Sequence, residues 1–262
     1  MFGIVMKQST QWIILLCCVF AAAACAADSS STTPLYSLAP GTKWSYDETK
    51  DLVEIVDLYT NVTHVTGTVN EEIFPAPAHY KKNGDTVLSQ STSKEQHDVD
   101  GHSIEVSGGS IQILEWRHGD LYSHGIRVWV DGSYSEAMNL YDPPLPLLKS
   151  AAHPGETWTV GNQKNMGIGL STIATMQAPE TVTVPAGTFT NCLKVLYSST
   201  VESLNGKARL EGGNVQDTIW YAKNVGTVKE FQVSRITYVT QQGRIFDHEE
   251  QTRVLRSHTP AK

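Results

Sequence analysis

The sequence predicts an all-β protein: a strongly curved antiparallel sheet, either an open barrel or two docked β units, with little or no helix after the N-terminal segment. Three observations favour this fold class. Runs rich in Val, Ile, Thr and Tyr recur along the chain, and such residues favour strands. No window beyond the N-terminal segment keeps a 3.6-residue apolar period. Tight-turn pairs separate the runs, and the helical crossovers that parallel strands need are absent from the pattern.

Residues 1–25 are predicted to be a signal peptide, because a basic residue precedes the apolar run "WIILLCCVFAAAACAA", which is short for a membrane span. Two cleavage positions are open. "AAAC" is a permissive lipobox that would leave Cys25 lipidated, followed by a polar tether over residues 26–35. The overlapping "ACA" would instead release a soluble periplasmic or secreted protein by cleavage before Ala27. Lipidation at Cys25 predicts an outer-membrane lipoprotein of the bacterial cell envelope that faces the periplasm and touches the membrane only through its lipid.

Charge and cysteine content exclude several classes. The 262 residues carry a formal net charge of −7, and no cluster of Lys and Arg is present, which disfavours nucleic-acid binding. Of the four cysteines, Cys192 alone lies outside the N-terminal segment, so a mature chain without Cys25 has no internal disulfide. We expect Cys192 to be a buried, small apolar side chain.

The first β unit is predicted over residues 36–142. Its strand-like runs include "LVEIVDLYT", "SIQILEW" and "GIRVWVDG". The pairs Asn83-Gly84, Asp100-Gly101 and Asp131-Gly132, like Asn205-Gly206 further on, tolerate the positive φ angles of hairpin turns and therefore predict antiparallel hairpins.

A Pro-rich connection over residues 143–152 follows, because prolines are confined to edge or linking segments of a sheet. The second unit is predicted over residues 153–258, docked to the first. Its start repeats the start of the first: "APGTKWSY" recurs as "HPGETWTV". The repeat predicts that Trp44 and Trp158 are each buried at the beginning of a strand, just after a Pro-Gly turn.

A further hairpin is predicted in "ETVTVPAGTFTNCLKV" (Glu180–Val195). Pro185 suits the first turn position, and Gly187 then takes a positive φ in a bulge. By period two, Cys192 is expected on the face opposite Leu193 and Val195.

Candidate site residues are few. No catalytic motif and no cofactor motif is present, and we expect the protein not to be an enzyme. "HDVDGH" places His97, Asp98, Asp100 and His102 within six residues, a weak candidate metal site, whereas solvated residues at a hairpin tip are the simpler interpretation. Five tryptophans could line an apolar pocket or pack in the core: Trp44, Trp116, Trp129, Trp158 and Trp220.

The chain resembles a family of uncharacterised bacterial envelope proteins, many of them lipoproteins. The resemblance is carried by Gly41–Tyr46, Gly155–Trp158, the V-P-A-G-T-F-x-x-C-L-K-V hairpin in Val182–Val195, and "WYAKNVGTVK" (Trp220–Lys229). It implies a strongly curved antiparallel sheet, related to the open barrels of lipoprotein carriers, and it implies no known activity or catalytic residue.

Three functions are open. The first is a non-enzymatic envelope protein that binds a lipid or another apolar or amphiphilic ligand on its curved sheet. The second is a structural or assembly lipoprotein that binds another envelope protein. The third is an enzyme of unrecognised type that uses the His and Asp residues of the turns.

Overall fold

The computed structural model describes residues 38–56, 59–80, 85–99, 102–130, 133–134, 138–165, 168–203, 210–240 and 243–262. The first six strands are β1 (Lys43–Val56), β2 (Tyr59–Pro75), β3 (Asp85–Val99), β4 (His102–Arg117), β5 (Asp120–Val130) and β6 (Ser133–Tyr134). The remaining strands are β7 (Asn139–Leu148), β8 (Thr157–Asn165), β9 (Ile168–Val184), β10 (Gly187–Ser203), β11 (Leu210–Ala222), β12 (Gly226–Thr240) and β13 (Gly243–Thr259). Within these described ranges one short 3₁₀ helix, η2 (Ala78–Tyr80), lies between β2 and β3.

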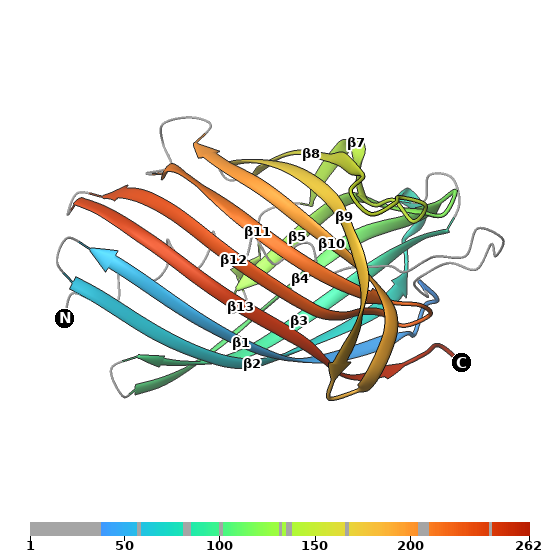
Figure 1. Cartoon of the computed structure of the whole chain (residues 1–262), viewed down its shortest axis with the longest axis horizontal. Coiled ribbons are helices and arrows are strands. Elements are labelled where there is room, and N and C mark those ends of the chain that lie inside the picture. The colour runs from blue at the N-terminus through green and yellow to red at the C-terminus, as the bar shows by residue number, and fades with distance from the viewer. Residues whose placement is uncertain are drawn as a thin grey trace.

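All described strands belong to one antiparallel sheet, in the order β6-β5-β4-β3-β2-β1-β13-β12-β11-β10-β9-β8, with β7 paired to β5. The sheet curls until its two ends approach one another, so that β7 and β8 lie side by side (Figure 1). No strand pairing joins β7 to β8 in the described residues. The all-β curved sheet predicted from the sequence is therefore confirmed as a barrel with one open seam.

The seam is bridged by side chains. The Trp158 indole Nε1 donates a hydrogen bond to the Pro146 carbonyl at 3.0 Å, and the Tyr197 hydroxyl donates to the Leu147 carbonyl at 2.9 Å. The Pro-rich segment lies in β7, beside the edge of the sheet. The boundaries of the two β units stay a prediction. β1 belongs to the first predicted unit and β13 to the second, and these two strands pair with one another along the length of β1.

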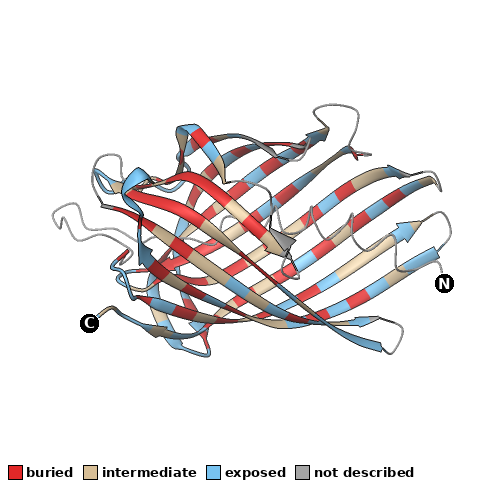
Figure 2. Cartoon of the chain, turned by 180° about the vertical axis from the view of Figure 1, so that it is seen from behind, coloured by how far each residue is buried: buried red, intermediate tan, exposed pale blue. Residues whose placement is uncertain are grey.

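Alternation along the strands creates an inner and an outer face. The burial pattern of β13 changes almost at every residue, and Figure 2 shows the same banding on the neighbouring strands. The inner face near β8–β11 is mainly apolar and includes Trp158, Met176 and Val195 in the main core cluster. Where the described residues are helical, no segment is both long and apolar enough to cross a membrane.

The predicted repeat is present in the structure. Gly41 and Gly155 have φ of 95° and 90°, and each is the third residue of a turn closed by a hydrogen bond, from Thr42 N to Ala39 O (3.1 Å) and from Glu156 N to His153 O (2.9 Å). These are the properties of type II turns, which require a positive φ at that position.

The strand after each turn also begins alike. Gly41 N donates to Ile73 O on β2, and Gly155 N donates to Met176 O on β9, both at 2.8 Å. Trp44 and Trp158 then enter the core with 2% and 5% of their surface exposed. The burial predicted for both tryptophans at the start of a strand is confirmed.

The hairpin between β9 and β10 confirms one prediction and corrects another. Gly187 pairs with Val184 and has a φ of 136°, as predicted. Cys192 does not face away from Leu193 and Val195: all three are buried in the same core. The register shifts on both sides of Cys192, and Asn191 adopts a left-handed φ of 54°. This bulge turns the thiol inward, which strict alternation could not predict.

We expect Gly187→Val to lower the unfolding free energy by about 1 kcal/mol or more, because a β-branched side chain resists positive φ. A Cβ at Gly187 would meet nothing within 4 Å, so the loss would come from the backbone alone. Denaturant titration measures it. Thr190→Val, at an exposed position of the same strand, is the control, and an equal stability for the two variants would contradict the assignment.

Candidate binding site on the concave face

Charged side chains occupy the inner face of the sheet across the neighbouring strands β12, β13, β1, β2 and β3. Cross-strand register places Glu230 beside Arg253, and Arg253 beside Glu48. Lys50, two residues after Glu48, points the same way. All four are nearly inaccessible to solvent. Charged side chains are rarely buried unless they are paired. Each of these four residues is therefore expected to have an oppositely charged partner nearby.

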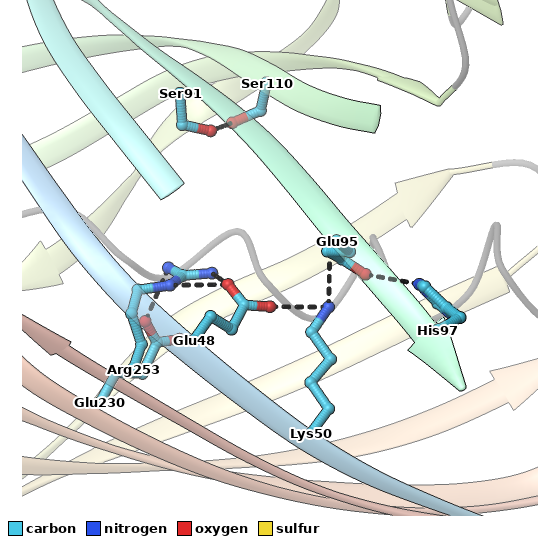
Figure 3. A network of polar contacts seen from close by, with 8 residues as sticks. All are labelled: Glu48, Lys50, Ser91, Glu95, His97, Ser110, Glu230 and Arg253. Carbon is cyan, nitrogen blue, oxygen red and sulfur yellow. Dashed lines mark hydrogen bonds and ion pairs between the residues drawn. The ribbon is translucent and has the colours of Figure 1, made fainter. Parts of the chain in front are cut away.

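A chain of ion pairs crosses this face (Figure 3), here called the ion-pair chain; its members are Glu230, Arg253, Glu48, Lys50, Glu95 and His97. The Arg253 guanidinium donates to Glu230 at 2.9 Å and to Glu48 at 3.1 Å. The Lys50 ammonium lies 2.8 Å from Glu48 and 2.9 Å from Glu95. Glu95 in turn contacts the half-buried His97 at 2.9 Å. Each cation therefore bridges two carboxylates.

The pKa of Glu95 shows that pairing outweighs burial at this end of the ion-pair chain. Burial raises its pKa, but the neighbouring Lys50 charge and hydrogen bonds from His97 and Lys50 bring the pKa down to about 2. At the other end burial dominates: the pKa of Glu230 is raised although Arg253 opposes the shift.

Further carboxyl groups on the same face lack hydrogen-bond partners among the described protein atoms: both oxygens of Asp217, Oδ1 of Asp247 and Oε1 of Glu249. Burial is the main cause that raises the pKa of each of them. The pKa of Asp247 reaches about 8, with added repulsion from Glu249 and Glu54, and the pKa of Glu249 reaches about 7. These two groups consequently exchange protons near neutral pH.

We expect the unfolding free energy to fall as pH rises from about 4 to about 8, because Asp247 and Glu249 hold protons in the folded state that they lose in the unfolded state. Glu95 acts oppositely: its contribution is present above its unfolded pKa and is lost as pH falls towards about 2. Urea titrations across this range measure the slope. The double variant Asp247→Asn, Glu249→Gln should flatten it, and an unchanged slope would contradict the assignment.

A small cavity lies next to the ion-pair chain. It has a volume of about 50 Å³, which is room for a few water molecules. Glu48, Glu71 and Arg253 flank it, and small side chains leave it open; they are Ser89, Ser91, Ser93 and Ser110. Ser91 and Ser110 hydrogen-bond to one another at 3.0 Å, and the Ser89 hydroxyl donates to Glu71. We call this cavity the serine trough. It offers hydroxyl and carboxylate oxygens, beside one guanidinium, to a small polar group.

The predicted aromatic residues do not line the serine trough. Trp44, Trp158 and Trp220 are buried, while Trp116 and Trp129 are half-buried. The Trp44 indole donates to the Val225 carbonyl at 2.6 Å, and the Trp220 indole donates to Glu180.

The predicted metal-site residues are only partly brought together. His97 contacts Glu95, while Asp98 and His102 are exposed. Asp100 lies outside the described residues, as do the four tight-turn pairs, Cys25 and the signal region. In the described part of the chain, no group of three His, Cys, Asp or Glu side chains is arranged to hold a metal ion.

Cys192 is the free thiol of the described residues. Burial raises its pKa to about 11, so it is protonated at neutral pH, whereas a thiol nucleophile needs the thiolate. Its Sγ instead donates weakly to the Phe189 carbonyl at 3.4 Å. The environment is that of a packing residue.

Comparison with known proteins places one stretch of the chain. A family model described as DUF3108-like matches residues 157–235, from the start of β8 into β12, and this stretch contains the Val182–Val195 hairpin. The expected resemblance to an uncharacterised family is confirmed in part, over less than a third of the chain. No curated protein matches the sequence.

Solved structures give remote likenesses. A protein described as exported, with a YmcC-like fold, from Bacteroides fragilis is 16% identical, with a TM-score of 0.41 over 84% of this chain and 96% of that chain. The attachment invasion locus protein Ail of Yersinia pestis, in complex with the heparin analogue sucrose octasulfate, is 7% identical, with a TM-score of 0.24 over 83% of this chain and 99% of that chain. Scores this low add nothing to the fold described above.

Proposed function

We propose that this protein is an exported, non-enzymatic envelope protein that binds an amphiphilic ligand on its concave sheet and is anchored by a lipid on Cys25. The observation that carries the ligand proposal is the serine trough. Its hydroxyls and carboxylates, together with Arg253, are suited to hydrogen-bond the polar group of a ligand.

The chemistry of this face favours a polar group over a hydrocarbon tail. An acyl chain laid against Glu48, Glu71 and Arg253 would remove water from charged groups without replacing their hydrogen bonds, which is costly. Of the two ligand types that the sequence analysis left open, a purely apolar ligand is therefore less suited to the serine trough than an amphiphilic one. The tail of an amphiphile would have to lie outside the serine trough.

Native mass spectrometry of the purified, exported protein tests this proposal. We expect a copurified amphiphile as an added mass, reduced in Ser110→Leu, which would fill the serine trough. Ser198→Leu, at an exposed position on β10, is the control, and thermal scans verify that both variants are folded. A protein that carries no added mass, or an adduct that Ser110→Leu leaves undiminished, would contradict the proposal.

A specific observation favours a second function, binding of another envelope protein. Four exposed apolar side chains lie near the ends of β1, β2, β12 and β13: Ile55, Val62, Val239 and Phe246. Ile55 and Phe246 are direct cross-strand partners. Exposed apolar clusters of this kind are typical of interaction surfaces. Cross-linking in cells, compared between wild type and Ile55→Lys, would detect such a partner.

We expect Cys25→Ser to release the protein from the membrane fraction or to leave it uncleaved, because the lipid would have no attachment point. Cell fractionation and the intact mass of the mature protein measure the two outcomes. Cys18→Ser, within the same apolar run, is the control. A mature N-terminus at Ala27 without a lipid mass would instead support release as a soluble protein.

A further inference from the structure

A second concavity lies on the opposite, outer face of the sheet, across β13, β1, β2 and β3. It is open and has a volume of about 410 Å³, which is within the range of about 300–1,000 Å³ that is typical of small-molecule sites. A bulge between Ser45 and Tyr46, where β1 pairs with β13, bends the sheet at this point. We call this concavity the outer groove.

Strand register gives the outer groove two ordered rows of polar side chains. The first row runs across the four strands as Ser257, Ser45, Asn70 and Thr92. The second runs in parallel as Thr259, Lys43, Glu72 and Gln90. Strands lie about 4.8 Å apart and alternate residues about 7 Å apart, so the rows form a grid about 14 Å wide.

The outward-facing side chains of the lining are rich in hydrogen-bonding groups and carry no net charge. The Lys43 ammonium and the Glu72 carboxylate neutralise one another at 2.9 Å. The other outward-facing polar groups are hydroxyls and two amides, Asn70 and Gln90. Trp44 and Glu71 also border the outer groove, but both are buried. A neutral grid of donors and acceptors suits an uncharged ligand with many hydroxyl groups.

Asn70, at the centre of the grid, is held in place. Its Oδ1 accepts a hydrogen bond from the Ser45 hydroxyl at 2.8 Å, and Ser45 in turn accepts from Arg256 at 2.8 Å. This contact uses only the oxygen of the Asn70 amide, so the two N–H groups of Nδ2 can donate to other acceptors. Side chains held before binding lose little entropy on binding.

One aromatic residue completes the outer groove. Phe74 follows Glu72 on β2, on the same face, and 36% of its surface is exposed. An exposed ring beside amides and hydroxyls can cover the apolar face of a sugar ring while its neighbours bind the hydroxyls.

We propose that the outer groove binds a neutral carbohydrate segment. This inference is independent of the concave-face ligand, since the two sites lie on opposite faces of the sheet. The ligand class follows from the neutral, hydroxyl- and amide-rich lining, from the single exposed ring and from the width of the grid, which accommodates a short oligosaccharide rather than one small solute.

An array of neutral oligosaccharides, probed with the labelled exported protein and followed by calorimetry on the best binder, tests the proposal. We expect at least one neutral oligosaccharide to bind, with an affinity that does not change between low and high salt. Phe74→Ala and Asn70→Ala should each weaken it about threefold to tenfold, the usual weight of one aromatic contact or one hydrogen bond.

Tyr59→Ala is the matched control, because Tyr59 is an exposed aromatic residue, with 82% of its surface exposed, at the opposite end of β2 from Phe74. It should leave the affinity unchanged. Absence of binding to every neutral oligosaccharide would overturn the proposal. So would an equal loss in Tyr59→Ala, or binding restricted to charged glycans and abolished by salt.

Discussion

Replacing Trp44 by alanine is expected to lower the unfolding free energy by about 3–5 kcal/mol, the range for emptying a large aromatic core site. Trp158→Ala is expected to fall in the same range. Both indoles are buried and each donates a hydrogen bond to a backbone carbonyl outside its own strand. Such a loss is a large fraction of the stability of an ordinary domain. Denaturant titration measures it.

Trp44→Phe separates the two contributions of the indole. It keeps most of the apolar contact but leaves the Val225 carbonyl without the indole donor, at a cost of about 1–3 kcal/mol. Trp116→Ala, at a half-buried position, should cost less than Trp44→Ala. If both Trp44→Ala and Trp158→Ala cost no more than Trp116→Ala, the repeated Pro-Gly-Trp unit does not organise the core.

Arg253→Met is expected to destabilise the protein by about 3–5 kcal/mol, because it leaves Glu48 and Glu230 buried without their shared partner. Arg256→Met is the control on the same strand. Arg256 pairs with Asp47 at 3.3 Å near the surface, where an ion pair contributes about 0–1 kcal/mol.

Neutralising the two carboxyl groups distinguishes charge from packing. Adding Glu48→Gln and Glu230→Gln to Arg253→Met should recover part of the loss, since no unpaired charge then remains in the interior. Equal stabilities of Arg253→Met and Arg256→Met in denaturant would show that the ion-pair chain does not contribute to folding as described.

Apolar patterning predicted the all-β curved sheet, and turn chemistry predicted the Pro-Gly starts and the positive φ of Gly187. The side of Cys192 was predicted wrongly, because one left-handed residue, Asn191, shifts the alternation. Asparagine tolerates that conformation better than most residues, so it was the available signal.

The candidate site could not be predicted in the same way. In "SYDETKD" (Ser45–Asp51), residues of both faces are polar, so the buried Glu48 and Lys50 look like solvated residues. Their burial depends on the pairing of β1 with β13, a contact between segments far apart in sequence. No local pattern encodes that pairing. The outer groove depends on the same register, so local sequence patterns could not predict it either.

The β1–β13 ladder has a consequence for the order of folding. Strands β1 to β5 and β8 to β12 pair with sequence neighbours, so each group can form as a run of local hairpins. The middle of the finished sheet, by contrast, needs Lys43 opposite Thr259, and loop closure over such a distance is slow. In a chain that is exported with its N-terminus first, β1 could not pair with β13 until β13 had also crossed the membrane. The ion-pair chain, which spans this late junction, would then assemble only once the whole protein is on the far side of the membrane.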